Sequence, residues 1–261
     1  MIEINAEDEV AYKAHRERWW RANYPSERLF KVLNVNGLPY HGGSGRWPLP
    51  ENGSAGEWLE VRGKLVDCEN GLHLCRVRDL PLWFGPVIFA AELDGEWFDA
   101  GNKIIARKAR LLRQLAWDDR IARHFACDCA ERALKRERKA GRDSDKRSRE
   151  TIRVARRFAN GLASMDELAA AWDAAGNAEW RRLVRPWAAA WDAAGASAGW
   201  AARDAAEVAA WAAARDAAGA TWGVATWGVT QAAAAAQAAE RTWQTKRLLD
   251  YLDGKRTLPP I

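Results

Sequence analysis

The stretch PVIFAAELDGEWFDAGNKIIARKARLLRQL, residues 86–115, decides the fold class of the first half of the chain. Its apolar residues come in short runs and near-alternation, which is typical of β-strands. We predict strands at residues 87–91 and 104–112, and a shorter one at residues 65–66. Asp94-Gly95 lies between apolar runs and predicts a hairpin turn, because glycine tolerates the positive φ that such turns need. These features favour a small antiparallel sheet.

The composition changes near residue 117, where glycine and proline no longer punctuate the chain and alanine begins to dominate. Residues 117–141 start with an aspartate cap and end on a glycine, which fits the left-handed end of a helix. A second helix is predicted at about residues 144–159, and it ends at Asn160-Gly161. The second half is therefore predicted to be helical.

A capping box supports a further helix start, because Ser164 and Glu167 have the spacing at which each side chain satisfies an orphan backbone donor. A helix is also expected near the beginning of the chain, at about residues 6–22. We therefore predict the α+β class, with an N-terminal helix and small antiparallel sheet in residues 1–116. An alanine- and tryptophan-rich helical bundle would follow in residues 117–261.

Trp200, Trp211 and Trp222 are 11 residues apart, so on a helix they would form one stripe. We interpret this stripe as packing between helices, with a partner-binding face as the alternative. Residues 217–239 carry no charge, yet they are mainly alanine and include two glutamines, which gives little energy for membrane insertion. A buried helix is expected there, and no membrane association.

The chain has 261 residues and a formal net charge of +5, but its positive charge is unevenly placed. Residues 103–157 hold 19 Lys and Arg against 8 Asp and Glu. This stretch is interpreted as a solvated helix face, and it could also attract nucleic acid or an acidic protein. Four cysteines are too few for a disulfide framework, and the acidic start does not resemble a signal peptide. A cytoplasmic location is expected.

Residues 31–115 resemble a family of uncharacterised phage and bacterial proteins. The resemblance is carried by KVLNVNGLPYHGGSGRWPLP, then CENGLHLCRVRDLPLWFGPVIFAAELDGE, then NKIIARKARLLRQL. The second half resembles the alanine-rich helical region of immunity proteins of bacterial toxin systems, through RHFACDCAERAL and closing helices such as RTWQTKRLLDYLDG. These resemblances imply a role in phage–host or toxin conflict and bring no established activity.

Two clusters combine cysteine with histidine. CENGLHLC at residues 68–75 and HFACDC at residues 124–129 contain the side-chain types that zinc prefers. Their spacing differs from the usual CxxC and HxxxH pairs, and on a helix Cys127 and Cys129 would point about 200° apart. We therefore predict no metal site and interpret these cysteines as buried apolar residues.

A ligand site is expected near His41 and His73, with Trp47 and Trp83 as apolar walls. Both histidines lie beside glycines, in predicted turns where a ligand can approach the backbone closely. Aromatic walls with a few convergent polar groups are the usual composition of a small-molecule pocket. The competing interpretation is that the histidines cap turns and the tryptophans fill the core.

The leading functional hypothesis is a non-catalytic protein that binds a ligand or partner without a cofactor. The alternative is an enzyme similar to ADP-ribosyltransferases, in which His41 and His73 would hold NAD. Glu92, at the end of a predicted strand, would then be the carboxylate that such chemistry needs beside the sugar. A cleft that joins all three residues would favour the enzyme.

Overall fold

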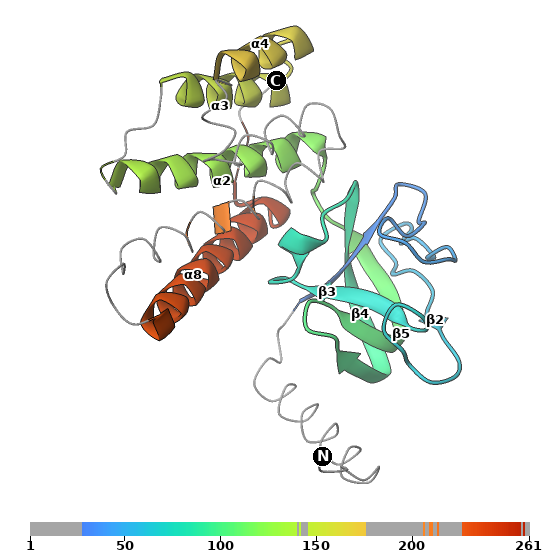
Figure 1. Cartoon of the computed structure of the whole chain (residues 1–261). Coiled ribbons are helices and arrows are strands. Elements are labelled where there is room, and N and C mark those ends of the chain that lie inside the picture. The colour runs from blue at the N-terminus through green and yellow to red at the C-terminus, as the bar shows by residue number, and fades with distance from the viewer. Residues whose placement is uncertain are drawn as a thin grey trace.

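The computed structural model describes most of the sheet region and most of the helices outside the alanine-rich segment. The described residues are 28–139, 141, 146–175, 206, 209–210, 213, 226–256 and 258. Within them the fold is α+β: every strand lies between Leu29 and Gln114, and the α-helices follow from Asp119 onward (Figure 1). The predicted helix at residues 6–22 and the tryptophan stripe lie outside the described residues.

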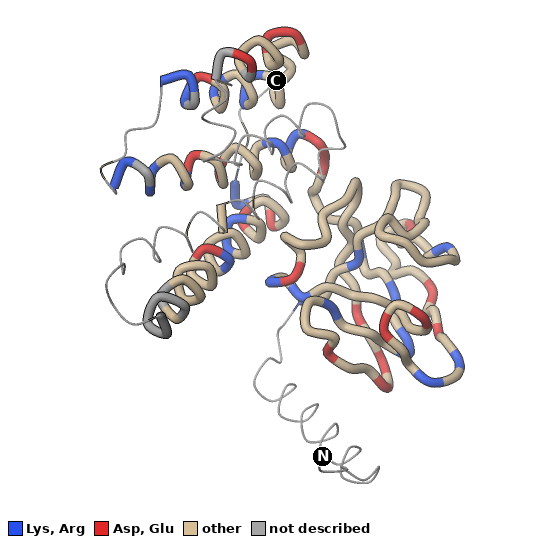
Figure 2. Tube along the Cα trace, in the orientation of Figure 1, with Lys and Arg blue, Asp and Glu red and all other residues tan. Residues whose placement is uncertain are grey.

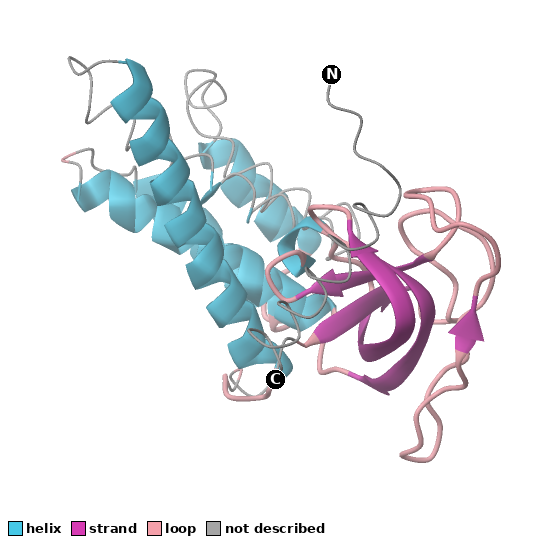
Figure 3. Ribbon diagram, turned by 90° about the horizontal axis from the view of Figure 1, so that it is seen from below, coloured by secondary structure: helices cyan, strands magenta, loops and turns pink. Residues whose placement is uncertain are grey.

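Four antiparallel strands close into a small barrel, which Figure 3 shows as a curled sheet beside the helices. In chain order, the first of these strands pairs with the second strand on one edge and with the third strand on its other edge. The fourth strand pairs with both the second and the third strands, which closes the ring. In chain order these strands are β1 (Leu29–Leu33), β3 (Leu72–Arg76), β4 (Val87–Asp99) and β5 (Ile104–Gln114). The short β2 (Leu59–Glu60) pairs with β5.

The predicted hairpin turn at Asp94-Gly95 is wrong, because β4 runs straight through it. Gly95 has a φ of +74° and lies where the pairing register with β5 shifts, so the glycine supports a bulge and not a turn. The strand reverses instead at residues 100–103, where Ala100 N–H donates to the Lys103 carbonyl at 3.0 Å. Asp99 accepts the N–H of Gly101 at 2.8 Å and fixes this turn.

The predicted strand at residues 65–66 is also wrong, since Val66 forms only an isolated bridge with Asn70. The strand in this region is β3, so His73 lies on a strand and not in the predicted turn. β3 begins immediately after Gly71, whose missing side chain permits a close approach to β5. A Cβ at Gly71 would lie 2.3 Å from Cγ2 of Ile105.

Alternation along the strands fills two hydrophobic clusters on opposite faces of the sheet. The barrel cluster contains the inward residues of all four strands together with Trp47; these include Leu29, Leu33, Leu74, Phe89, Ile104 and Leu111. The sheet–helix cluster joins the other face to the helices; it includes Phe30, Val32, Ile88, Trp117, Phe125, Leu248 and Tyr251. One continuous core therefore crosses residue 117, with apolar residues from before and after it.

The helices are α2 (Asp119–Lys139), α3 (Lys146–Ala159), α4 (Met165–Ala175) and α8 (Thr226–Leu252). The predicted caps are confirmed: Asp118 accepts the N–H of Ile121 at 2.7 Å, and Ser164 and Glu167 exchange hydrogen bonds. Between residues 176 and 225 the structure describes only four alanines, all of them buried. No helix in the described ranges is long and apolar enough to cross a membrane.

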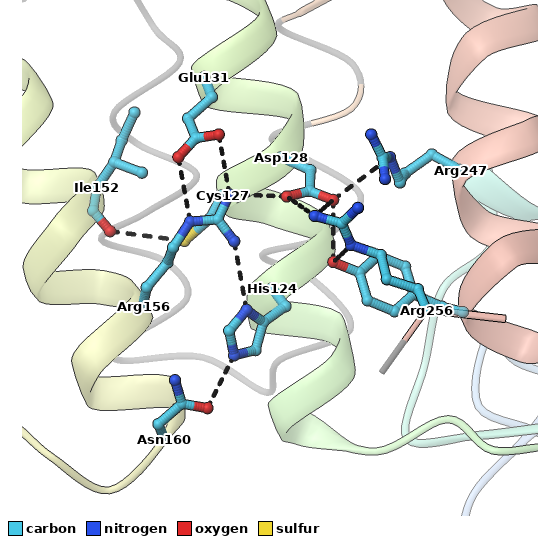
Figure 4. Close-up of polar contacts among 10 residues, drawn as sticks. His124, Cys127, Asp128, Glu131, Ile152, Arg156, Asn160, Arg247 and Arg256 are labelled. Atoms are coloured by element: carbon cyan, nitrogen blue, oxygen red, sulfur yellow. Dashed lines mark hydrogen bonds and ion pairs between the residues drawn. The ribbon is translucent and has the colours of Figure 1, made fainter. Parts of the chain in front are cut away.

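A buried carboxylate joins three elements of the helical half (Figure 4). Asp128 of α2 accepts from Nη2 of Arg156 on α3 at 2.7 Å and from the Tyr251 hydroxyl on α8 at 2.9 Å. Arg247 and Arg256 each approach it within 3.4 Å. Burial raises the pKa of Tyr251, and the negative charge of Asp128 raises it further, so the hydroxyl stays protonated and donates.

We predict that Asp128→Asn lowers the free energy of unfolding by about 1–3 kcal/mol, because it leaves the partly buried arginines without their counter-charge. Denaturant unfolding measures this loss. The exposed Asp173 of α4 gives the matched control, since Asp173→Asn makes the same chemical change at the surface. A loss for Asp128→Asn no larger than that of the control would contradict the proposed importance of this contact.

Candidate functional site

A cleft of about 480 Å³ lies beside β1 and β3. Its walls come from the loop after β1 and from the segment that leads into β3. Trp83, after the short 3₁₀ turn at Leu80–Leu82, and Lys103, immediately before β5, complete them. All four residues predicted to bind a ligand line it: His41, Trp47, His73 and Trp83. The structure therefore brings together residues that the sequence separates widely, although their contact with a ligand stays a prediction.

His41 fixes one wall of the cleft. Its Nε2 lies 2.8 Å from the carbonyl oxygen of Trp83 and 3.0 Å from that of Phe84. Carbonyls only accept, so this nitrogen carries the proton and shares it between them. The imidazole also meets the Trp83 ring edge to face, with 5.3 Å between ring centres. His41 thus holds the glycine-rich loop against Trp83 and sets the shape of the wall.

Lys31 supplies a cation that the sequence analysis missed. Alternation places it on the same face of β1 as Leu29 and Leu33, which belong to the barrel cluster. Its Nζ donates to the His73 carbonyl at 2.9 Å and lies 4.9 Å from the centre of the Trp47 ring. The ion pairs among the described residues include none to Lys31. Burial lowers the pKa of Lys31 to about 8.

Lys103 is a second cation in the cleft. Its environment raises its pKa, whereas that of Lys31 lowers the pKa. Its Nζ lies 2.8 Å from Asp67 and donates to Sγ of Cys68 at 3.1 Å. Burial alone would lower the pKa of Lys103, but the hydrogen bonds to Asp67 and Cys68 raise it above its ordinary value. The cleft therefore contains one lysine that is held charged and one whose charge is weakened.

His73 contributes an unsatisfied polar atom. Its Nε2 is buried and has no hydrogen-bond partner among the described residues. Burial lowers the pKa of His73, and the positive charges of Lys31 and Lys103 lower it further, so the imidazole is neutral at pH 7. A buried polar atom without a partner is unusual in a folded protein, and a ligand atom is one explanation for it.

Glu92 does not line this cleft. It lies on β4 and forms an ion pair with Arg110 of β5, with 2.5 Å between Nε and Oε1. The arrangement that the ADP-ribosyltransferase alternative requires, with His41, His73 and Glu92 around one cleft, is thus not what the structure shows. The strand pairing explains this, since Glu92 and Arg110 are register partners and turn toward the same face.

The cysteines of the two clusters have separate environments. Cys68 is exposed in the cleft, while Cys75, Cys127 and Cys129 are buried, and all four are free thiols. Burial raises the pKa of both Cys75 and Cys127 to about 12, so these thiols stay protonated. Across the part of the chain that the structure describes, no three His, Cys, Asp or Glu side chains are grouped to hold a metal ion.

The basic stretch at residues 103–157 has many internal partners. Figure 2 shows Lys or Arg interspersed with Asp or Glu along α2 and the barrel strands. On β5, Lys108 pairs with Asp94 at 3.1 Å, in addition to the Arg110 pair. Arg132 and Arg136 of α2 both pair with the buried Glu240 of α8. Much of this positive charge therefore stabilises the fold, and recognition of nucleic acid or an acidic partner by this stretch stays a prediction.

Comparison with family models, curated proteins and solved structures gave no match for this chain. The chemistry of the cleft must therefore be argued from its own residues. Tyr40 and Trp83 are half-buried and can contact a flat apolar group, whereas Trp47 is buried in the barrel cluster, as the competing interpretation expected. Lys31 and Lys103 can bind an anion, and the neutral His73 can exchange one hydrogen bond.

We predict that Lys31→Met raises the free energy of unfolding by about 1–3 kcal/mol at pH 7, because it removes a poorly solvated ammonium. The folded-state pKa of Lys31, about 8, lies below its ordinary value of 10.5, so the unfolded chain binds the extra proton between these pH values. Wild-type stability should accordingly rise from pH 8 to 10.5, and the variant should lack this contribution.

Denaturant unfolding at several pH values measures both effects. The exposed Lys64 provides the control, since Lys64→Met should change stability by less than about 0.5 kcal/mol. If Lys31→Met destabilises the protein at pH 7, the ammonium is better stabilised in the folded state than we infer.

Proposed function

We propose that this protein binds a small organic anion with a planar ring in the cleft between Trp47, Trp83 and the two lysines. One observation carries the proposal: the ammonium of Lys31 lies part-buried in the cleft without a carboxylate partner among the described residues. Placing such a charge away from water is unfavourable unless another charge compensates it. An anionic ligand would supply that compensation.

The other lining residues fit the same class of ligand. Lys103 is held charged by Asp67 and can attract the anion, and the buried Nε2 of His73 can pair with one of its polar atoms. The aromatic side chains offer area for a ring. A binding protein without a bound cofactor is the function that we propose. A cytoplasmic location, which would keep the four thiols reduced, and a role in phage–host or toxin conflict remain part of the proposal.

Isothermal titration calorimetry with matched ligands tests the proposal. Phenyllactate and adenosine monophosphate present a ring with a carboxylate or a phosphate, and phenylethanol and adenosine are their neutral counterparts. We predict that at least one anion binds at pH 7 and binds ten-fold or more tightly than its neutral counterpart. The stronger of the two anions identifies the preferred charged group. Equal binding of anions and neutral compounds, or no binding of any of them, would refute the proposal.

Variants and pH locate the effect in the cleft. Lys31→Met and Lys103→Met should each weaken binding of the anion about ten-fold or more, because a charged hydrogen bond contributes about 1.5–3 kcal/mol. Lys64→Met removes the same charge outside the cleft and should leave the affinity unchanged. Wild-type affinity should fall as the pH rises past about 8, where Lys31 loses its proton. An affinity that is constant up to pH 9 would argue against a role for Lys31.

A further inference from the structure

The two lysines of the cleft differ in a way that simple anion binding does not require. Lys103 has an ion-pair partner in Asp67 and a second acceptor in Cys68, so its Nζ remains an ammonium. Lys31 donates to the His73 carbonyl and lies over the Trp47 ring, it interacts electrostatically with the buried thiol of Cys75 and the imidazole of His73, and the ion pairs of the described residues include none to it. Environments that separate the protonation of two like groups are typical of sites where one binds charge and the other reacts.

From the geometry of this cleft we infer that Lys31 forms a reversible imine with the carbonyl group of an aromatic oxo acid, whose carboxylate faces Lys103. The inference rests on the proposed function, because it assigns the ligand of the same cleft. Desolvated lysines in apolar surroundings are the usual amine nucleophiles for carbonyl substrates. The half-buried Tyr40 and Trp83, which line the same cleft, provide the apolar surfaces that an aryl group needs.

The reaction balances without an oxidant or reductant. The neutral amine of Lys31 attacks the carbonyl carbon, a C–N bond forms as the C=O π bond breaks, and one proton passes from the nitrogen to the oxygen to give a carbinolamine. Loss of the hydroxyl group with one proton as water then leaves a C=N bond between Nζ and the ligand. Because burial lowers the pKa of Lys31, a larger fraction of this side chain is the free amine at pH 7 than for an ordinary lysine.

Reductive trapping on the full chain tests the inference. The protein is incubated at pH 7 with phenylpyruvate and cyanoborohydride, which reduces an imine to a stable secondary amine, and modified lysines are located by peptide mass spectrometry. We expect Lys31 to carry the adduct at least ten-fold more than Lys64 or Lys103 in the same sample. Labelling of Lys31 should rise with pH and level off above about pH 8.

Two controls separate this inference from the proposed function. Phenyllactate, which has the carboxylate and the ring but no carbonyl, should bind and protect Lys31 from labelling. Lys31→Arg has no amine that can form an imine, so it should lose trapping at this site, whereas Lys64→Arg, outside the cleft, should leave both phenyllactate binding and trapping at Lys31 unchanged.

The outcomes are distinct. If phenyllactate binds but Lys31 is labelled no more than Lys64, the imine is refuted and the anion site remains. If neither phenyllactate nor phenylpyruvate binds, and phenylpyruvate does not label Lys31, the oxo-acid inference is refuted. Binding of adenosine monophosphate in that case would leave only the proposed anion site.

Discussion

The pairing of β4 with β5 is the constraint on which the rest of the structure depends, because it closes four short strands into a barrel. Closure gives β1 an apolar environment on both faces, and four of its five residues are buried. The remaining residue is Lys31, which shares a face with Leu29 and Leu33. A charge on an inward position of a barrel strand is a local violation of strand patterning. Such violations are expected where a protein binds something.

The helices support the barrel through charges as well as through apolar contacts. Phe30, Val32 and Ile88 pack against α2 and α8 in the sheet–helix cluster. The helices are held to one another by the buried carboxylates Asp128 and Glu240, each surrounded by arginines. Because both carboxylates are buried, each depends on arginines of neighbouring elements to compensate its charge.

Local signals in the sequence predicted some features well and others poorly. Helix caps depend on neighbouring residues, so Ser164 and Glu167 could be assigned correctly. Asp94-Gly95 has the same local pattern in a turn and in a bulge, and only the pairing with β5 decides between them. Of the cleft, the aromatic and histidine residues were predicted from composition. Lys31 and Lys103 were missed, because their roles depend on the closure of the barrel and on the distant partner Asp67.

The central claim is that the Lys31 ammonium lacks a counter-charge until an anion occupies the cleft. NMR titration of the lysine side chains, with Lys31 assigned by comparison with Lys31→Arg, measures this directly. We expect Lys31 to titrate near pH 8 in the free protein and at a clearly higher pH when phenyllactate is bound. A Lys31 signal that titrates near the ordinary value of 10.5 and does not move with ligand would contradict it.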